Sequence, residues 1–222
     1  MRMKKLLSLA LVGALVCTGT ASVIAANASK QEMKLREANL FTDVVKGNED
    51  GFITKGEAVV LVLNALGYKE DVNTKEDYVK LNPFSDASAA YKGYLGLAYD
   101  LGLVQKADSF NENEAAKEDY LLGLVLRALN YQDAFTDTEN LAVKQGLVDE
   151  SDYIEDDVTR AEAAEIILNS LNAELGDGTK TKFGEYLVRA GILSEDKLAT
   201  LGVKASVKDK EDIHILYFND FH

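Results

Sequence analysis

The strongest constraint on this chain is an internal repeat that marks helix starts. Thr159–Glu162 has the pattern Thr-x-x-Glu directly before an apolar run, and Thr54–Glu57 repeats it. In such a capping box the Thr hydroxyl accepts from the backbone N–H of the Glu, while the Glu carboxylate accepts from the backbone N–H of the Thr. Each box therefore predicts the first turn of a helix, over Ala58–Leu66 in one copy and Ala163–Leu171 in the other.

Apolar residues behind both boxes recur at helical spacing, which predicts one buried face per helix. A third segment, Leu122–Leu129, has the same spacing, and Leu126–Tyr131 matches the end of the first helix at Leu63–Tyr68. Units that repeat at this length bury their apolar faces only against one another. We therefore expect an all-α bundle of packed units. The apolar positions are Val59, Val62, Leu63 and Leu66; Leu122, Val125, Leu126 and Leu129; and Ala164, Ile167, Leu168 and Leu171.

A second pattern, Phe followed by a hydroxyl residue and Asp, occurs at Phe41–Asp43, Phe84–Asp86 and Phe135–Asp137. The Phe can fill the core, and the two polar side chains are good N-caps for the segment that follows. Thr136 and Glu139 have capping-box spacing, so a further box is predicted there.

Glycine turns are expected to close helices over Leu95–Leu101 and Leu141–Gln145, because Gly102 and Gly146 permit the left-handed conformation that stops a helix. Pro83 should end a helix between the first two units.

The remaining helices flank the repeats. One is predicted over Ser29–Leu40, and two more over Thr179–Ala190 and Glu195–Leu201. Few residues separate Phe41–Asp43 from the first box. The first unit has therefore lost its first helix or takes it from Ser29–Leu40.

Residues 1–28 have the pattern of a secretory signal peptide, because basic residues precede the apolar run Leu6–Val16 and small residues follow at Ala26–Ala28. The run is short for a membrane anchor. A lipoprotein signal would use Cys17, but the preceding Val16 is bulkier than that signal normally accepts.

The formal net charge is -13, and the single cysteine lies in the signal segment. A mature chain without cysteine has no disulfide, so its stability depends on a hydrophobic core. The acidic balance argues against non-specific binding to nucleic acid or to an anionic membrane. Any anion-binding site must therefore be local.

The repeated unit resembles the S-layer homology (SLH) domain in its Phe-x-Asp opening, its Gly-Leu-Val turn and its Thr-Arg-Ala-Glu box, with Val158–Glu162 the most specific segment. The resemblance covers about residues 30–175. It implies a pseudo-threefold helical bundle that binds an anionic secondary cell-wall polymer and holds a secreted protein non-covalently on the bacterial wall. The chain departs from the family in having no Trp. The units would be 29–70 (incomplete), 82–132 and 133–175, followed by a helical extension over 176–207.

Anion-binding candidates are the cations inside predicted helix starts, because their charge adds to backbone N–H groups that point to solvent. Arg160 is the first candidate, since a guanidinium can bind a carboxylate or phosphate bidentately. Lys55 is the second. Lys117 is the third, in a box one residue out of register. The alternative is that these are solvated first-turn residues. The aspartates expected to order the adjacent loops are Asp43, Asp86 and Asp137.

Calcium binding is a competing interpretation of the first unit. With Gly51 as the turn glycine, four residues stand at ligand positions of an EF-hand loop, but Lys46 stands at the first ligand position, where a carboxylate is needed. The four residues are Asn48, Asp50, Ile53 and Glu57.

The C-terminal residues 208–222 consist of a charged linker, the predicted strand Ile213–Phe218 and the segment Asn219–His222. This end resembles the opening of the metallophosphoesterase fold of secreted 5′-nucleotidases. The resemblance implies that Asp220 and His222 would be ligands of a divalent metal pair in a complete enzyme. Without the remaining strands and ligands we expect no phosphatase activity and no cofactor, and an orphan strand that is poorly ordered.

Together these features predict the export signal and wall anchor of a surface phosphoesterase, ending where the enzyme domain begins. The alternatives are an S-layer structural subunit and a vestigial surface phosphoesterase fragment.

Overall fold

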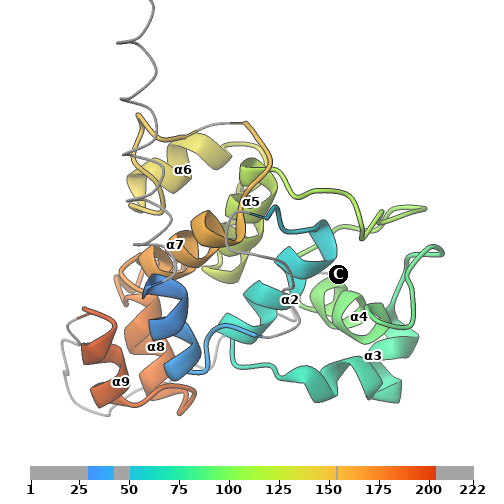
Figure 1. Ribbon diagram of the computed structural model, residues 1–222, viewed down its shortest axis with the longest axis horizontal. Coiled ribbons are helices and arrows are strands. Elements are labelled where there is room, and N and C mark those ends of the chain that lie inside the picture. The colour runs from blue at the N-terminus through green and yellow to red at the C-terminus, as the bar shows by residue number, and fades with distance from the viewer. Residues whose placement is uncertain (1–29, 43–50, 154, 204–222) are drawn as a thin grey trace, which may run out of the picture.

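The computed structural model describes residues 30–42, 51–153 and 155–203. Their structure is mostly helical and contains no sheet, which confirms the predicted helical class (Figure 1). Residues 1–28, Asp43 and residues 208–222 lie outside this part, so the predictions made for them stay predictions. A helix over 30–37 comes first. After it come α2 (Lys55–Ala65), the 3-10 turn η1 (Glu70–Thr74), α3 (Glu76–Leu81), α4 (Lys92–Asp100), α5 (Glu118–Ala128), α6 (Thr138–Lys144), α7 (Arg160–Ser170), α8 (Phe183–Arg189) and α9 (Glu195–Thr200).

Both predicted capping boxes are present and begin α2 and α7. The backbone N–H of Thr54 donates to Glu57 Oε2 at 2.9 Å, and that of Thr159 donates to Glu162 Oε2 at 2.7 Å. Each Thr hydroxyl accepts from the backbone N–H of its Glu at 3.2 Å. The two helix starts are therefore fixed locally by the residues that predicted them.

The segments that precede α2, α5 and α7 are joined by a closed ring of three backbone hydrogen bonds. The N–H of Ile53 donates to Val158 O at 3.1 Å, the N–H of Val158 to Ala116 O at 2.9 Å, and the N–H of Ala116 to Ile53 O at 2.9 Å. All three residues are buried, with at most 1% of their surface exposed. This hydrogen-bonded ring brings the starts of the three longest helices to one point in the core.

A second set of bonds extends the same arrangement by two residues on each segment. The N–H groups of Lys55, Glu118 and Arg160 donate to the carbonyl oxygens of Glu114, Asp156 and Gly51 at 2.8, 2.9 and 3.0 Å. These three residues are therefore structurally equivalent. The equivalent of Lys55 and Arg160 is thus the acidic Glu118, while Lys117 occupies the N-cap position of Thr54 and Thr159.

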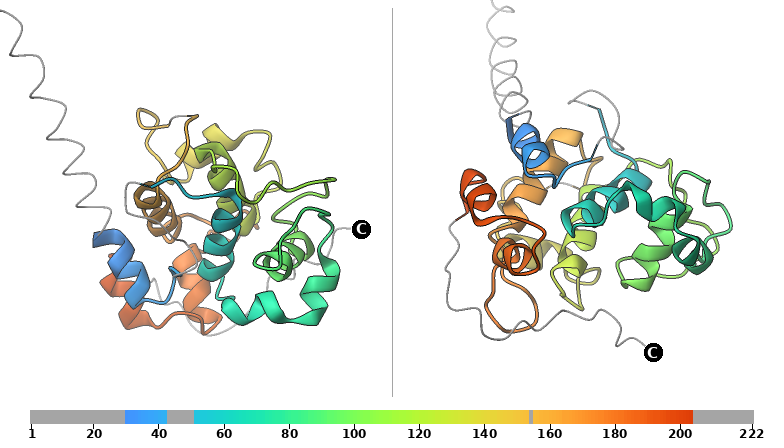
Figure 2. Two further views of the ribbon diagram at one scale, coloured as in Figure 1. Left: turned by 45° about the vertical axis from the view of Figure 1, so that its right-hand side comes forward. Right: turned by 90° about the horizontal axis from the view of Figure 1, so that it is seen from below.

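Shorter helices pack between the long ones. Helix α4 packs against α2, and α6 packs against α5. Helix α8 starts beside the end of α7, because the N–H of Gly184 donates to Leu171 O at 2.9 Å. Ile192, which follows α8, lies beside the end of α2, where a Cβ added at Gly67 would be 2.9 Å from Ile192 Cγ1. The helix over 30–37 lies beside α8 and α9, so the two ends of the described chain are adjacent (Figures 1 and 2).

Two predicted helix starts are wrong, because a turn occupies the first residues of each. Thr136 forms no capping box: its hydroxyl donates to Asp133 O at 3.1 Å, and α6 begins only at Thr138. The helix predicted from Thr179 begins at Phe183, since Lys180 has a φ of 59° and interrupts the helical backbone. The helix ends at Gly102 and Gly146 are confirmed, with φ of 69° and 67°.

Pro83 follows α3, which ends at Leu81 as its position predicts. In the part of the chain that the structure describes, no helix has the length and apolar character needed to cross a membrane.

Candidate functional site: the groove beside Lys55

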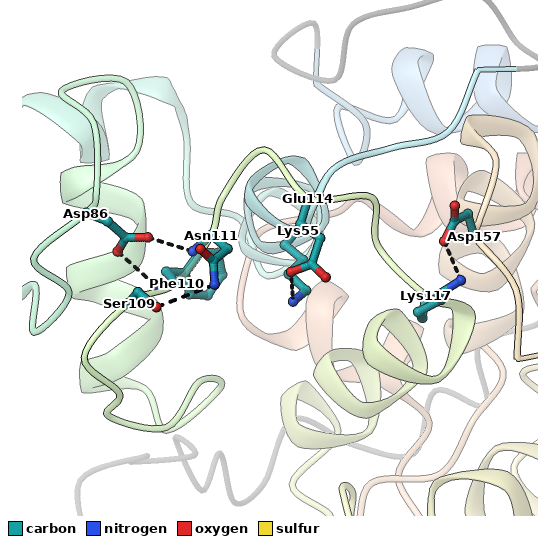
Figure 3. Close-up of polar contacts among 8 residues, drawn as sticks. All are labelled: Lys55, Asp86, Ser109, Phe110, Asn111, Glu114, Lys117 and Asp157. Carbon is teal, nitrogen blue, oxygen red and sulfur yellow. Dashed lines mark hydrogen bonds and ion pairs between the residues drawn. The ribbon is translucent and has the colours of Figure 1, made fainter.

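Each predicted cation is paired with a carboxylate. Lys55 pairs with Glu114, Lys117 with Asp157 and Arg160 with Glu32 (the first two in Figure 3). The pairs differ in their exposure to solvent and in the surface around them. These two properties decide which cation can bind a ligand.

Arg160 is held by two hydrogen bonds to one carboxylate. Its Nε donates to Glu32 Oε2 at 3.0 Å and its Nη2 donates to Glu32 Oε1 at 2.5 Å. The two side chains are only 13% and 9% exposed. The guanidinium also lies 5.7 Å from the centre of the Phe41 ring. The first candidate of the sequence analysis is therefore occupied by a group of the protein itself.

Lys117 lies at the surface, where its Nζ is 2.7 Å from Asp157 Oδ1 and 3.8 Å from Asp156 Oδ1. The hydrogen bond to Asp157 raises the pKa of Lys117 above its usual value. Such exposed pairs contribute little to stability, because water and salt screen them. Because Lys117 stands at the N-cap position, its register also differs from that of the other two cations.

Lys55 borders a groove with a volume of about 260 Å³. Four of its nine lining residues are aromatic. The rings of Phe84 and Phe110 lie 5.0 Å apart between centres, and Lys55 Nζ lies 5.9 Å from the centre of the Tyr120 ring. The lining residues are Lys55, Phe84, Val104, Gln105, Ala107, Ser109, Phe110, Tyr120 and Phe135.

Tyr120 combines an aromatic ring in this wall with a polar hydroxyl group. Its hydroxyl oxygen is buried and has no hydrogen-bond partner among the residues that the structure describes. Burial raises the pKa of the phenol, so the group stays a neutral donor and acceptor at physiological pH. A buried hydroxyl without a partner costs about 1–3 kcal/mol.

The aspartates have different roles. Asp86 orders a loop, as predicted, but it does so across the chain and does not cap the next helix: its carboxylate accepts from the N–H groups of Phe110 and Asn111, both at 2.8 Å (Figure 3). These bonds set the position of Phe110 in the groove wall. Asp137 is exposed and accepts from Asn140 Nδ2 at 2.6 Å.

The contacts of Asp86 predict a pH effect. The N–H donors of Asn111 and Phe110 hold the pKa of Asp86 below its ordinary value, so its contribution to stability is present above the unfolded pKa of about 4 and is lost as pH falls through the folded pKa. Asp86→Asn should lower the urea midpoint at neutral pH, and its difference from the wild type should shrink in acid. The control is Asp108→Asn, an exposed neighbour. A difference that persists at low pH would contradict this explanation.

The sequence analysis missed Tyr120, the aromatic groove and Glu32. In the register of the hydrogen-bonded ring, Tyr120 takes the place of the capping-box residues Glu57 and Glu162. A Tyr at a Glu position was the available signal, but it becomes visible only once Glu118 is aligned with Lys55.

Among the described residues, no group of three or more His, Cys, Asp or Glu side chains could hold a metal ion. Of the residues proposed as calcium ligands, Glu57 accepts a hydrogen bond from the backbone N–H of Thr54, and both backbone groups of Ile53 bond within the hydrogen-bonded ring. Asn48, Asp50, Asp220 and His222 fall outside the described ranges.

Comparison of the chain with protein-family models, with curated proteins and with solved structures gave no match.

Proposed function

We propose that this protein binds an anionic cell-wall glycopolymer through the groove beside Lys55 and thereby attaches non-covalently to the bacterial cell surface. The observation that carries the proposal is the combination in one groove of aromatic rings, a lysine and the exposed polar side chains of Gln105 and Ser109. The groove volume lies just below the roughly 300–1,000 Å³ of pockets for drug-sized ligands, which suits a single sugar ring.

Each part of the groove matches one part of a charged sugar. The C–H face of a pyranose is apolar and packs on aromatic rings, here the half-buried rings of Tyr120 and Phe135. Its hydroxyl groups need hydrogen-bond partners when they leave water, and the exposed side chains of Gln105 and Ser109 in the groove can supply them. A carboxylate or phosphate on the sugar needs a cation, which Lys55 supplies.

The pair between Lys55 and Glu114 leaves the lysine available. The Glu114 side chain is 58% exposed and that of Lys55 is 25% exposed. Exposed pairs of this kind contribute about 0–1 kcal/mol, so an anionic ligand held by several further contacts can replace Glu114.

The SLH interpretation is supported by the cyclic equivalence of the three helix starts. Three units around an approximate threefold axis would account for the hydrogen-bonded ring. Helix α8, which starts beside the end of α7 and is followed by Ile192 beside the end of α2, would supply the helix that the first unit lacks. A wall-polymer partner and a location on the cell surface follow from this interpretation.

The test is co-sedimentation of the purified protein with wall sacculi before and after mild acid extraction of the secondary polymer. We expect binding only to unextracted walls, and we expect Lys55→Gln to weaken it about 10- to 100-fold, since a hydrogen bond to a charged group contributes about 1.5–3 kcal/mol.

Lys92→Gln is the matched control, because Lys92 is an exposed lysine at the start of α4 and does not line the groove. Equal binding by Lys55→Gln and wild type would reject the groove. If the wild type sedimented equally with extracted and unextracted walls, the polymer would be rejected as the ligand.

A further inference from the structure

Glu32, in the helix over 30–37, contacts Arg160 at the start of α7. The two residues are 128 positions apart in sequence, and the carboxylate binds the guanidinium through both of its oxygens, at 3.0 and 2.5 Å. Arg160 stands at the position equivalent to Lys55. An acidic side chain of the protein therefore occupies, at Arg160, the place that an anionic ligand would take.

The carboxylate is held firmly in place. Glu32 also accepts from Arg36 Nε at 2.6 Å, and both guanidinium groups lie over the Phe41 ring, at 5.1 and 5.7 Å from its centre. The segment that carries Glu32 is anchored by Leu35 and Leu40, which are fully buried. Glu32 is thus presented by a packed helix.

The three equivalent positions consequently offer different chemistry to an anion. Lys55 borders the groove, and its partner Glu114 is largely exposed. Glu118 carries a negative charge where the other two carry a cation. At the third position the partner of Arg160 is only 9% exposed, so water contributes little to separating the pair.

We propose that Glu32 is a built-in ligand that closes the Arg160 position, so that one protein molecule binds one anionic glycan segment, at Lys55. This inference rests on the proposed function for its ligand. Removal of the Glu32 carboxylate should open a second site of the same class, for a sugar carboxylate or phosphate.

Calorimetric titration with polymer released from walls by mild acid measures the number of sites. The wild type should bind one segment per chain and Glu32→Ala two, and Glu32→Ala combined with Arg160→Gln should return to one. Glu37→Ala is the control, since Glu37 is an exposed acid on the same helix. A wild type that already binds two segments, one of them lost in Arg160→Gln, would overturn the proposal, as would a single site in a folded Glu32→Ala.

A second measurement does not depend on the polymer. Phenylglyoxal modifies accessible guanidinium groups, and peptide mass spectrometry follows Arg160 alone. Arg160 should be modified at least tenfold faster in Glu32→Ala than in the wild type or Glu37→Ala, and added polymer should slow the reaction in Glu32→Ala. Equal rates in all three proteins would reject the closure. Protection of wild-type Arg160 without polymer binding by any variant would support the closure and reject the proposed function.

Thermal denaturation checks that Glu32→Ala is folded. If it is not, Glu32→Asp keeps the charge and shortens the side chain by one methylene, which prevents the bidentate contact. Faster modification of Arg160 in this variant would support the proposal, and an unchanged rate would oppose it.

Discussion

Replacement of Ile53 by alanine is expected to lower the free energy of unfolding by about 2–5 kcal/mol. Ile53 is completely buried, and both its N–H and its carbonyl belong to the hydrogen-bonded ring. Truncation leaves a cavity where the starts of α2, α5 and α7 meet, so the lost packing contacts weaken the junction of all three helices. Urea denaturation followed by far-ultraviolet circular dichroism measures it.

Phe52→Ala is the matched control. Phe52 precedes Ile53 and is the larger residue, but it is 57% exposed, so its removal should change the unfolding free energy by no more than about 0.5 kcal/mol. Similar losses for the two variants would show that burial of the Ile53 side chain adds nothing to the stability of this junction.

Gly96→Ala is expected to destabilise the protein by up to about 3 kcal/mol, although alanine favours a helix by about 1 kcal/mol over glycine. Gly96 lies in α4, where an added Cβ would be 1.8 Å from the carbonyl oxygen of Tyr78 in α3. A backbone atom cannot rotate away, so α3 must move. Thermal unfolding of the variant measures the loss.

The comparison for Gly96→Ala is Lys92→Ala, because Lys92 is an exposed residue at the start of the same helix. This control should be neutral within about 0.5 kcal/mol. A stabilised Gly96→Ala would mean that α3 can shift without cost and that the close approach to Tyr78 has no structural role.

Features set by neighbouring residues could be predicted from the sequence. The boxes at Thr54 and Thr159 were correct because Thr and Glu bond to groups three residues away, within the helix that they begin. The same rule failed at Thr136, where a turn from Asp133 takes the hydroxyl first. A local pattern competes with other local patterns, and spacing alone does not show which one forms.

The candidate site depends on contacts between distant residues, which a single sequence does not reveal. Asp86 was expected to act on its own segment but bonds to the N–H groups of Phe110 and Asn111. Arg160 was correctly placed at a helix start, but nothing near it in sequence indicated that Glu32 would reach it. The position of Arg160 at a helix start could therefore be predicted from the sequence. Its pairing with Glu32 could be seen only in the three-dimensional structure.

The hydrogen-bonded ring of Ile53, Ala116 and Val158 is made of main-chain groups alone. Peptide groups are the same whatever the side chain, so substitutions two and four residues further on leave the junction intact. Glu118 stands where the other two segments have a base, and Tyr120 stands where they have a carboxylate, yet all three segments make the same backbone hydrogen bonds. A junction of this kind allows the side chains at the three helix starts to differ in charge and size while the backbone that joins them stays the same.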